Sequence, residues 1–268
     1  MAVGKSVVDD VNGGTMHDAG VVRRYGQASE VTAPERVIYA RLRGELLGQP
    51  LLDLGVGGGR TVPALRALST DYVGVDYSQA MVDSVRRRFP GVRFEHGDAR
   101  ALTAFGDGQF AFVLFSCNGL GMIGHADRLR CLAEVHRVLR PGGYFAFSAH
   151  NQRSPDHAAG LQLPAFELTA HPVKLGVRVA RFVKHAALSA YNHRRLHVHD
   201  VRTPAYSIIN DRCHDYATML YYISLTAQRR QLEACGYAPA IEAFDLSGRA
   251  LGPGADTTDS SIYYLARK

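Results

Sequence analysis

Cysteine is scarce in this chain of 268 residues: only four are present, and no two lie close together. The spacing excludes a Cys-x-x-Cys zinc or redox motif, and four cysteines are too few for a disulfide scaffold. Cysteine usage of this kind fits a reducing compartment. We therefore expect a cytoplasmic protein without a bound metal.

Long apolar runs are missing as well. No stretch approaches the length of a membrane span, and the first residues lack the basic start and apolar run of a signal peptide. We therefore expect no membrane partner. Hydrophobic residues make up 46% and charged residues 21%, the balance of a globular protein with one substantial core.

The net charge of +6 and the pI of about 9.2 raise the question of a nucleic-acid partner. The basic tracts are short, and two of the three lie in predicted helices, where a solvated face explains them. Aromatic residues do not interleave with them as they do in surfaces that stack bases. A nucleic-acid partner is therefore disfavoured, and a homodimer stays open.

Strands and helices alternate from residue 31 to residue 149, with short turns between them. The patterns predict helices at 31–47, 60–68, 79–89 and 127–139 and strands at 51–54, 72–75, 92–95, 110–115 and 144–149. Such alternation is typical of a doubly wound, mostly parallel sheet. We predict an α/β fold with a seven-stranded sheet and helices on both of its faces.

The pattern breaks after residue 150. Residues 151–210 predict loops, a helix near 174–189 and a strand near 196–209. A helix at 215–235 and strands at 239–246 and 260–266 then complete the sheet. We predict a single domain, 1–268, with an aperiodic N-terminal arm or lid (1–30), a core (45–150), an inserted substrate lid (151–210) and a closing unit (211–268).

The main site motif runs from Asp53 to Arg60, Asp-Leu-Gly-Val-Gly-Gly-Gly-Arg, directly after a strand. Glycines allow a tight turn and the close approach of a ligand to the backbone. Asp76 ends the second strand, 21 positions after Gly55, where a carboxylate can accept both hydroxyls of a ribose. Asp98 follows the third strand, where it could meet an adenine edge.

Four motifs in this order resemble those of the class I, Rossmann-like S-adenosylmethionine-dependent methyltransferases. They span residues 52–60, 74–78, 97–99 and 137–143. The resemblance implies S-adenosylmethionine as cofactor and methyl transfer to oxygen, nitrogen, sulfur or carbon of a small molecule, in secondary metabolism by analogy. It also implies a set of cofactor-binding residues: Tyr25, Asp53, Gly55, Gly57, Asp76, Tyr77, Met81, Asp98, Ala99, Ser116 and Asn118.

Particular residues argue against some other chemistries, and the sequence leaves others open. A nicotinamide dinucleotide fingerprint needs a third glycine where Arg60 stands. Displacement without methyl transfer, such as cyclisation of the aminobutyrate arm, and a regulatory or nucleic-acid-binding module remain alternatives. The fourth strand runs into Ser116-Cys117-Asn118 without the Pro-Pro of relatives that methylate nucleobases or amides.

Methyl transfer mainly requires that the acceptor be held in line and that water be excluded. A base is needed only when the acceptor is still protonated near neutral pH. His150 and Asn151 end the fifth strand on the rim where the cofactor is expected. We predict that they orient the acceptor or take its proton.

Overall fold

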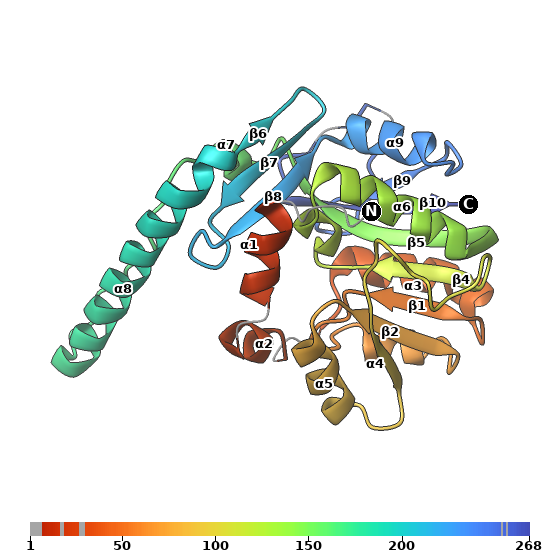
Figure 1. Ribbon diagram of the computed structural model, residues 1–268, viewed down its shortest axis with the longest axis horizontal. Helices are drawn as coiled ribbons and strands as arrows, with labels where there is room; N and C mark the ends of the chain where they lie inside the picture. The colour runs from red at the N-terminus through yellow and green to blue at the C-terminus, as the bar shows by residue number, and fades with distance from the viewer. Residues whose placement is uncertain (1–6, 17–18, 27–29, 253, 256) are drawn as a thin grey trace.

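The computed structural model describes residues 7–16, 19–26, 30–252, 254–255 and 257–268 (Figure 1). One ten-stranded sheet organises this part of the chain. Its strands are β1 (Leu51–Leu54), β2 (Tyr72–Asp76), β3 (Arg93–His96), β4 (Phe110–Phe115), β5 (Leu139–Asn151), β6 (Val201–Arg202), β7 (Tyr206–Asp211), β8 (Thr218–Ile223), β9 (Glu242–Phe244) and β10 (Ser261–Arg267).

The core of the sheet has the order β3-β2-β1-β4-β5, all parallel, followed by β10 and β9. β10 runs antiparallel to β5 and to β9. This confirms the doubly wound α/β class. The expected number of seven strands was wrong, because the inserted segment and the residues directly after it add β6, β7 and β8. These strands join the end of β5, where His150 and Asn151 pair with Tyr222 and Ile223 of β8.

Helices cover both faces of the core sheet. The helices α3 (Ala33–Leu46), α4 (Val62–Arg66) and α5 (Gln79–Arg88) pack in one apolar cluster, and α6 (His125–Val138) and α9 (Leu225–Ala234) pack in the other. Alternation along β1 sends Leu51 to the first cluster and Leu52 and Leu54 to the second. All four residues of β1 are buried, so both faces of the strand are covered. Such burial is typical of a central parallel strand.

The helix predicted at 215–235 was wrong in its first half. Residues 218–223 form β8, which pairs antiparallel with β7 from Tyr206↔Ile223 to Asp211↔Thr218. Helix α9 begins only after Ser224, whose side chain accepts from the backbone N–H of Ala227. The apolar run from Met219 to Ile223 is long enough for one buried strand, and pairing with β7 decides its conformation.

The N-terminal arm was predicted to be aperiodic. The structure instead has two helices there, α1 (Val7–Met16) and α2 (Ala19–Gly26). Asn12 explains how α1 is placed. Its side chain donates to the carbonyls of Met122 and Met219 at 2.8 Å and accepts from the Met219 N–H at 2.9 Å. These contacts with β8 and η1 (Gly119–Met122) come from tertiary structure and leave no periodic pattern in the arm.

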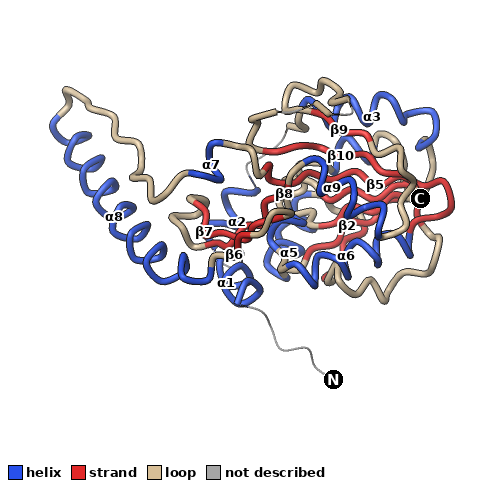
Figure 2. The backbone as a smooth tube through the Cα atoms, turned by 90° about the horizontal axis from the view of Figure 1, so that it is seen from above, coloured by secondary structure: helices blue, strands red, loops and turns tan. Residues whose placement is uncertain are grey.

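The inserted segment carries α7 (Pro155–Ala158), α8 (Pro172–Leu196) and η2 (His197–His199). Helix α8 has 25 residues, so it is longer than the helix predicted at 174–189, and it extends away from the sheet (Figure 2). The single strand expected at 196–209 is divided between η2, β6 and β7. None of the described helices is long and apolar enough to cross a bilayer.

Asp53 is the polar residue of β1, and its side chain is almost completely buried. It accepts hydrogen bonds from the Thr61 hydroxyl at 2.5 Å and the Tyr72 hydroxyl at 2.9 Å. Burial raises the pKa of Asp53 to about 7, and the two hydrogen bonds oppose that rise only in part. Ionising this carboxyl group therefore opposes folding.

We expect Asp53→Asn to gain stability relative to the wild type as pH rises. The pKa of Asp53 in the folded protein is above its ordinary value of 3.8, so the stability that the wild type gains from this group is full below pH 3.8 and is lost as pH rises to about 7. Thermal unfolding of both proteins across this window measures the difference. The matched control is Asp83→Asn at an exposed position. A wild-type-to-variant difference that stays constant with pH would contradict the assignment.

Candidate active site

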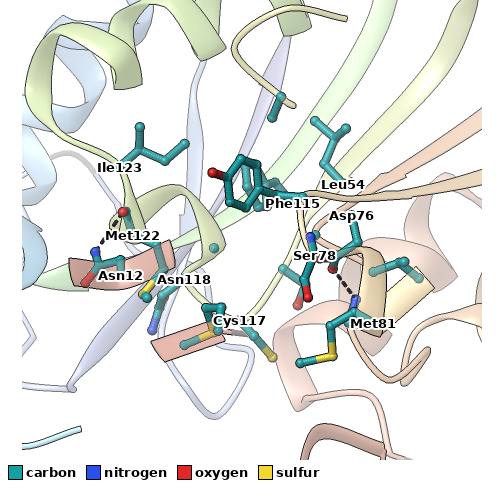
Figure 3. A pocket seen from close by; sticks show the side chains of 18 of the residues that line it. Asn12, Leu54, Asp76, Ser78, Met81, Phe115, Cys117, Asn118, Met122 and Ile123 are labelled. Atoms are coloured by element: carbon teal, nitrogen blue, oxygen red, sulfur yellow. Dashed lines mark hydrogen bonds between the residues drawn. The ribbon is translucent and has the colours of Figure 1, made fainter. Parts of the chain in front are cut away.

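A cavity of about 440 Å3 lies at the carboxyl ends of the parallel strands, where residues of α1 and of the β7–β8 hairpin also line it. This is the edge at which open α/β sheets bind ligands. Figure 3 shows Asn12, Met122 and Ile123 on one side and Leu54, Asp76, Ser78 and Met81 on the other. The cavity brings together twelve of the predicted site residues: Tyr25, Asp53, Gly55, Gly57, Asp76, Tyr77, Met81, Asp98, Ala99, Ser116, Asn118 and His150.

The glycine loop has the backbone that its sequence predicts. Gly55 has φ +61°, and a Cβ atom there would lie 2.8 Å from the Phe115 ring, so no other residue fits without a shift. Gly57 has φ +52° and donates its N–H to the Asp76 carboxylate at 2.8 Å. Asp76 also accepts from the Ser78 N–H at 2.8 Å. The loop after β1 is thereby fixed against the end of β2.

The Asp98 carboxylate forms an ion pair with Arg100. The Arg100 guanidinium donates to both Asp98 oxygens, and it also reaches Asp9 of α1 at 2.9 Å and Asp127 of α6 at 3.0 Å. Three carboxylates therefore surround one cation at the edge of the cavity. The arrangement ties α1 to the core beside the loop that holds Asp98 and Ala99.

Ser116 belongs to a buried polar network that the sequence prediction missed. Its hydroxyl donates to Glu35 and accepts from Arg60 at 2.6 Å. Arg60 forms a bidentate ion pair with Glu35 at 2.6 and 2.7 Å. Burial raises the pKa of Glu35, but Arg60 and the other donors outweigh burial and leave it below its usual value. The only sequence signal for Glu35 is the pattern Thr32-x-x-Glu35, which fits a helix capping box. In the structure the Glu35 side chain does cap α3, in addition to pairing with Arg60.

Asn118 and His150 meet at the end of β5. Asn118 has φ +56°, and its amide nitrogen lies 2.8 Å from the Ser261 hydroxyl and 3.4 Å from His150 Nδ1. With the amide assigned in this orientation, Nδ1 accepts and the imidazole proton resides on Nε2. Burial lowers the pKa of His150 to about 4, although Asp211 opposes the change. The imidazole is therefore neutral near pH 7.

Asn151, the thirteenth predicted residue, is not among those that line the cavity. Its amide group donates to the carbonyls of Thr257 and Asp259 and accepts from the Arg153 N–H. Alternation along β5 separates the two neighbours, so the side chain of His150 reaches the cavity and that of Asn151 ties two loops together.

The β7–β8 hairpin supplies cavity residues that no motif marked, among them Cys213 and His214. Three consecutive residues, His214, Asp215 and Tyr216, have φ between +53° and +59°. Such left-handed backbone costs of order 1–3 kcal/mol per non-glycine residue and persists only where the surroundings impose it. Here the Asn192 amide donates to the Asp215 carbonyl, and the Asn210 amide donates to the Tyr216 carbonyl.

Metal ligands do not gather in the part of the chain that the structure describes: no three His, Cys, Asp or Glu side chains form such a group. His193 and His197 lie one turn apart on α8 and its end, and His193 contacts the Asn210 amide oxygen at 3.0 Å. His197 contacts the backbone carbonyl of His193. These histidines take part in the packing of the inserted segment.

The core of the chain is similar in sequence to known methyltransferases. A family profile described as a methyltransferase domain matches residues 51–143. A probable S-adenosylmethionine-dependent methyltransferase of Mycolicibacterium smegmatis is 32% identical over 117 residues, covering 43% of this chain and 44% of that protein. A demethylmenaquinone methyltransferase of Clavibacter sepedonicus is 36% identical over 111 residues, or 40% and 44% of the two chains. The matched region spans less than half the length of these relatives.

Solved structures extend the likeness of fold to most of the chain. The methyltransferase CcbJ of Streptomyces caelestis matches with a TM-score of 0.62 at 18% identity, over 94% of this chain and 97% of that chain. The glycopeptide N-methyltransferase MtfA, solved with S-adenosylmethionine, matches with a TM-score of 0.53 at 17% identity, over 90% and 96%.

The motifs, the strand order and the profile match coincide in one region of the chain. The glycine loop and Asp76 lie within the matched residues 51–143, and these residues build the parallel part of the sheet. The part of the chain built from these residues therefore resembles the core of the S-adenosylmethionine-dependent methyltransferases.

Proposed function

We propose that this protein binds S-adenosylmethionine in the cavity and transfers its methyl group to a small, uncharged acceptor. The observation that carries the proposal is the pairing of the glycine loop with Asp76 at one end of the cavity. A second polar group fits a bound ligand as well. The Asn118 amide oxygen is buried and has no hydrogen-bond partner among the described residues, so a bound donor would satisfy it.

Charge is distributed unequally around the cavity. Its aspartates and arginines come from α1, the β1 and β2 ends and the loop after β3, and Arg60 and Arg100 are paired with carboxylates. The acceptor side, formed by α1 beyond its first turn, η1, β5 and the β7–β8 hairpin, is lined by uncharged polar, histidine and apolar residues: Asn12, Met16, Met122, Ile123, His150, Cys213, His214, Thr218 and Leu220. An acceptor with a net charge would lack a counter-ion there.

The residues of this chain would contribute binding, orientation and exclusion of water. Asp76 would hold the ribose, and Tyr77, Met81 and Ala99 would surround the adenine. The cofactor, when bound, supplies a methyl group already activated by a sulfonium. His150, neutral with its proton on Nε2, would donate a hydrogen bond that orients the acceptor. The N-terminal arm and the inserted segment would form the lid, and the protein would act in the cytoplasm.

Calorimetric titration with S-adenosylmethionine, S-adenosylhomocysteine and NAD tests the cofactor. We expect micromolar binding of the first two compounds and none of NAD, because Arg60 occupies the third-glycine position and is committed to Glu35. A screen of uncharged small acceptors, monitored by release of S-adenosylhomocysteine, tests the reaction. Tight NAD binding would overturn the proposal, and turnover without S-adenosylhomocysteine would indicate displacement without methyl transfer.

Asp76→Ala should weaken S-adenosylhomocysteine binding by about 1–3 kcal/mol, because the ribose hydroxyls and two backbone N–H groups lose their acceptor. Calorimetry measures the affinity, and thermal unfolding shows whether the variant folds. Asp83→Asn on the exposed side of α5 is the control and should bind as the wild type does. Unchanged affinity in a folded Asp76→Ala protein would remove the ribose assignment.

Asn12→Ala should accelerate release of S-adenosylhomocysteine on the order of tenfold, because it strands two carbonyls and one N–H that hold α1 over the cavity. Stopped-flow displacement measures the rate, and hydrogen exchange reports whether residues 7–16 open more readily. Asp10→Asn, on the exposed face of α1, is the matched control. An unchanged release rate in the Asn12 variant would show that α1 does not gate the cavity.

A further inference from the structure

Exposed apolar side chains concentrate in the inserted segment. Of the 18 large hydrophobic residues that the structure shows as exposed, 12 lie between residues 161 and 201. Four of them lie on the outward face of α8 and are each more than half exposed: Val173, Val177, Val183 and Tyr191. Soluble proteins seldom gather exposed apolar area in this way without a partner.

Helix α8 of this segment carries charge of one sign only. Residues 168–199 contain six Lys or Arg and no Asp or Glu. Arg178 faces Glu167 in the preceding loop, with 3.6 Å between Nη2 and Oε2. The other five cations have no ion-pair partner among the described residues: Lys174, Arg181, Lys184, Arg194 and Arg195.

Helical spacing brings the apolar and the basic residues onto a common face. Val173, Val177, Lys184, Tyr191 and Arg195 recur at intervals of four, seven, seven and four residues, so they form one stripe along α8. The opposite face is covered: Phe182 contacts Phe166 of the loop, and Ser189 and Leu196 are buried. The stripe therefore lies on the face of α8 opposite these covered residues, and α8 itself extends away from the sheet (Figure 2).

We propose that the outward face of α8 docks on the surface of an anionic lipid bilayer. A helix with apolar residues interleaved with Lys and Arg lies in the bilayer interface, where it buries its apolar face and keeps its cations near anionic headgroups. Nucleic acid would satisfy the cations but not the valines. A second copy of α8 would cover the valines but would bring like charges together.

Docking on a bilayer surface departs from the expectation of no membrane partner, but it does not require a membrane-spanning segment. That expectation rested on the absence of such a segment. Helix α8 is also connected with the cavity, because His185 pairs with Asp215 at 2.8 Å in the left-handed turn beside Cys213 and His214. Docking would place the acceptor side of the cavity close to the bilayer, whatever reaction the cavity performs.

Co-sedimentation of the full chain with vesicles tests the proposal. We expect binding to phosphatidylcholine vesicles that contain phosphatidylglycerol, weak binding to pure phosphatidylcholine, and release as ionic strength rises. Arg181→Gln with Lys184→Gln should weaken binding on the order of thirtyfold, at about fivefold per cation. Val177→Ser with Val183→Ser should weaken it as well, since the helix then buries less apolar area.

The matched control removes two exposed cations elsewhere, Arg43→Gln on α3 with Arg87→Gln on α5, and should bind vesicles as the wild type does. Retained S-adenosylhomocysteine binding shows that the α8 variants fold. Equal binding to both vesicle types, or none, would overturn the proposal. A dimer in light scattering that the α8 variants abolish would assign the face to a second copy, and tighter binding to duplex DNA than to vesicles would assign it to nucleic acid.

Discussion

The bidentate ion pair between Glu35 and Arg60 is the contact on which the site depends most. It joins the first turn of α3 to the end of the glycine loop, and through Ser116 it also holds the end of β4. Glu35 is almost fully buried, so removal of either partner would leave an uncompensated charge in the interior. The pair therefore fixes three segments that lie far apart in the sequence, and Asp76 then aligns β2 with the same loop through Gly57. A cavity bounded by loops needs such cross-links, because loops lack the regular hydrogen bonds of the sheet.

The acceptor side is built on a different principle, continuity of the sheet. β5 extends beyond the core: its last two residues pair with β8, and His150 also pairs with Ser261 of β10. The inserted segment is consequently attached by a strand pairing, which is stiffer than a flexible linker. Arg128 stabilises this junction. It is fully buried and donates to the Leu120 carbonyl and to the Gln228 side chain. Its guanidinium also lies 4.5 Å from the centre of the Tyr221 ring. The β7–β8 hairpin can therefore hold its left-handed turn in one position over the cavity.

The core could be predicted from the sequence because its signals are local. A glycine loop after a strand, an acidic residue at the end of the next strand and a continuous apolar run at Phe110–Phe115 each determine their own surroundings. The inserted segment and β8 after it could not be predicted in this way. Residues 219–223 fit a strand or part of a buried helix equally well, and only their pairing with β7 decides between them. Glu35, Asn12 and His214 reach the site from α3, α1 and a hairpin, and their roles depend on contacts across long stretches of chain. Asn151 shows the converse, since its place next to His150 in sequence does not bring its side chain to the cavity.

The two covers of the cavity differ in how readily they can move, and this difference indicates a route for the ligand. The hairpin is anchored by strand pairing and by α8, so displacing it would break several backbone hydrogen bonds at once. Helix α1 is held by side-chain contacts: Asn12 with β8 and η1, Thr15 with the Ala217 carbonyl, and Asp9 with Arg100. Water can replace such contacts one at a time, and local opening is easiest where few apolar groups are buried. In α1 only Asn12 is fully buried, and the apolar contribution to the core is limited to the half-buried Val8 and Val11. The cofactor would therefore enter and leave by displacement of α1, while the hairpin keeps the acceptor side in place.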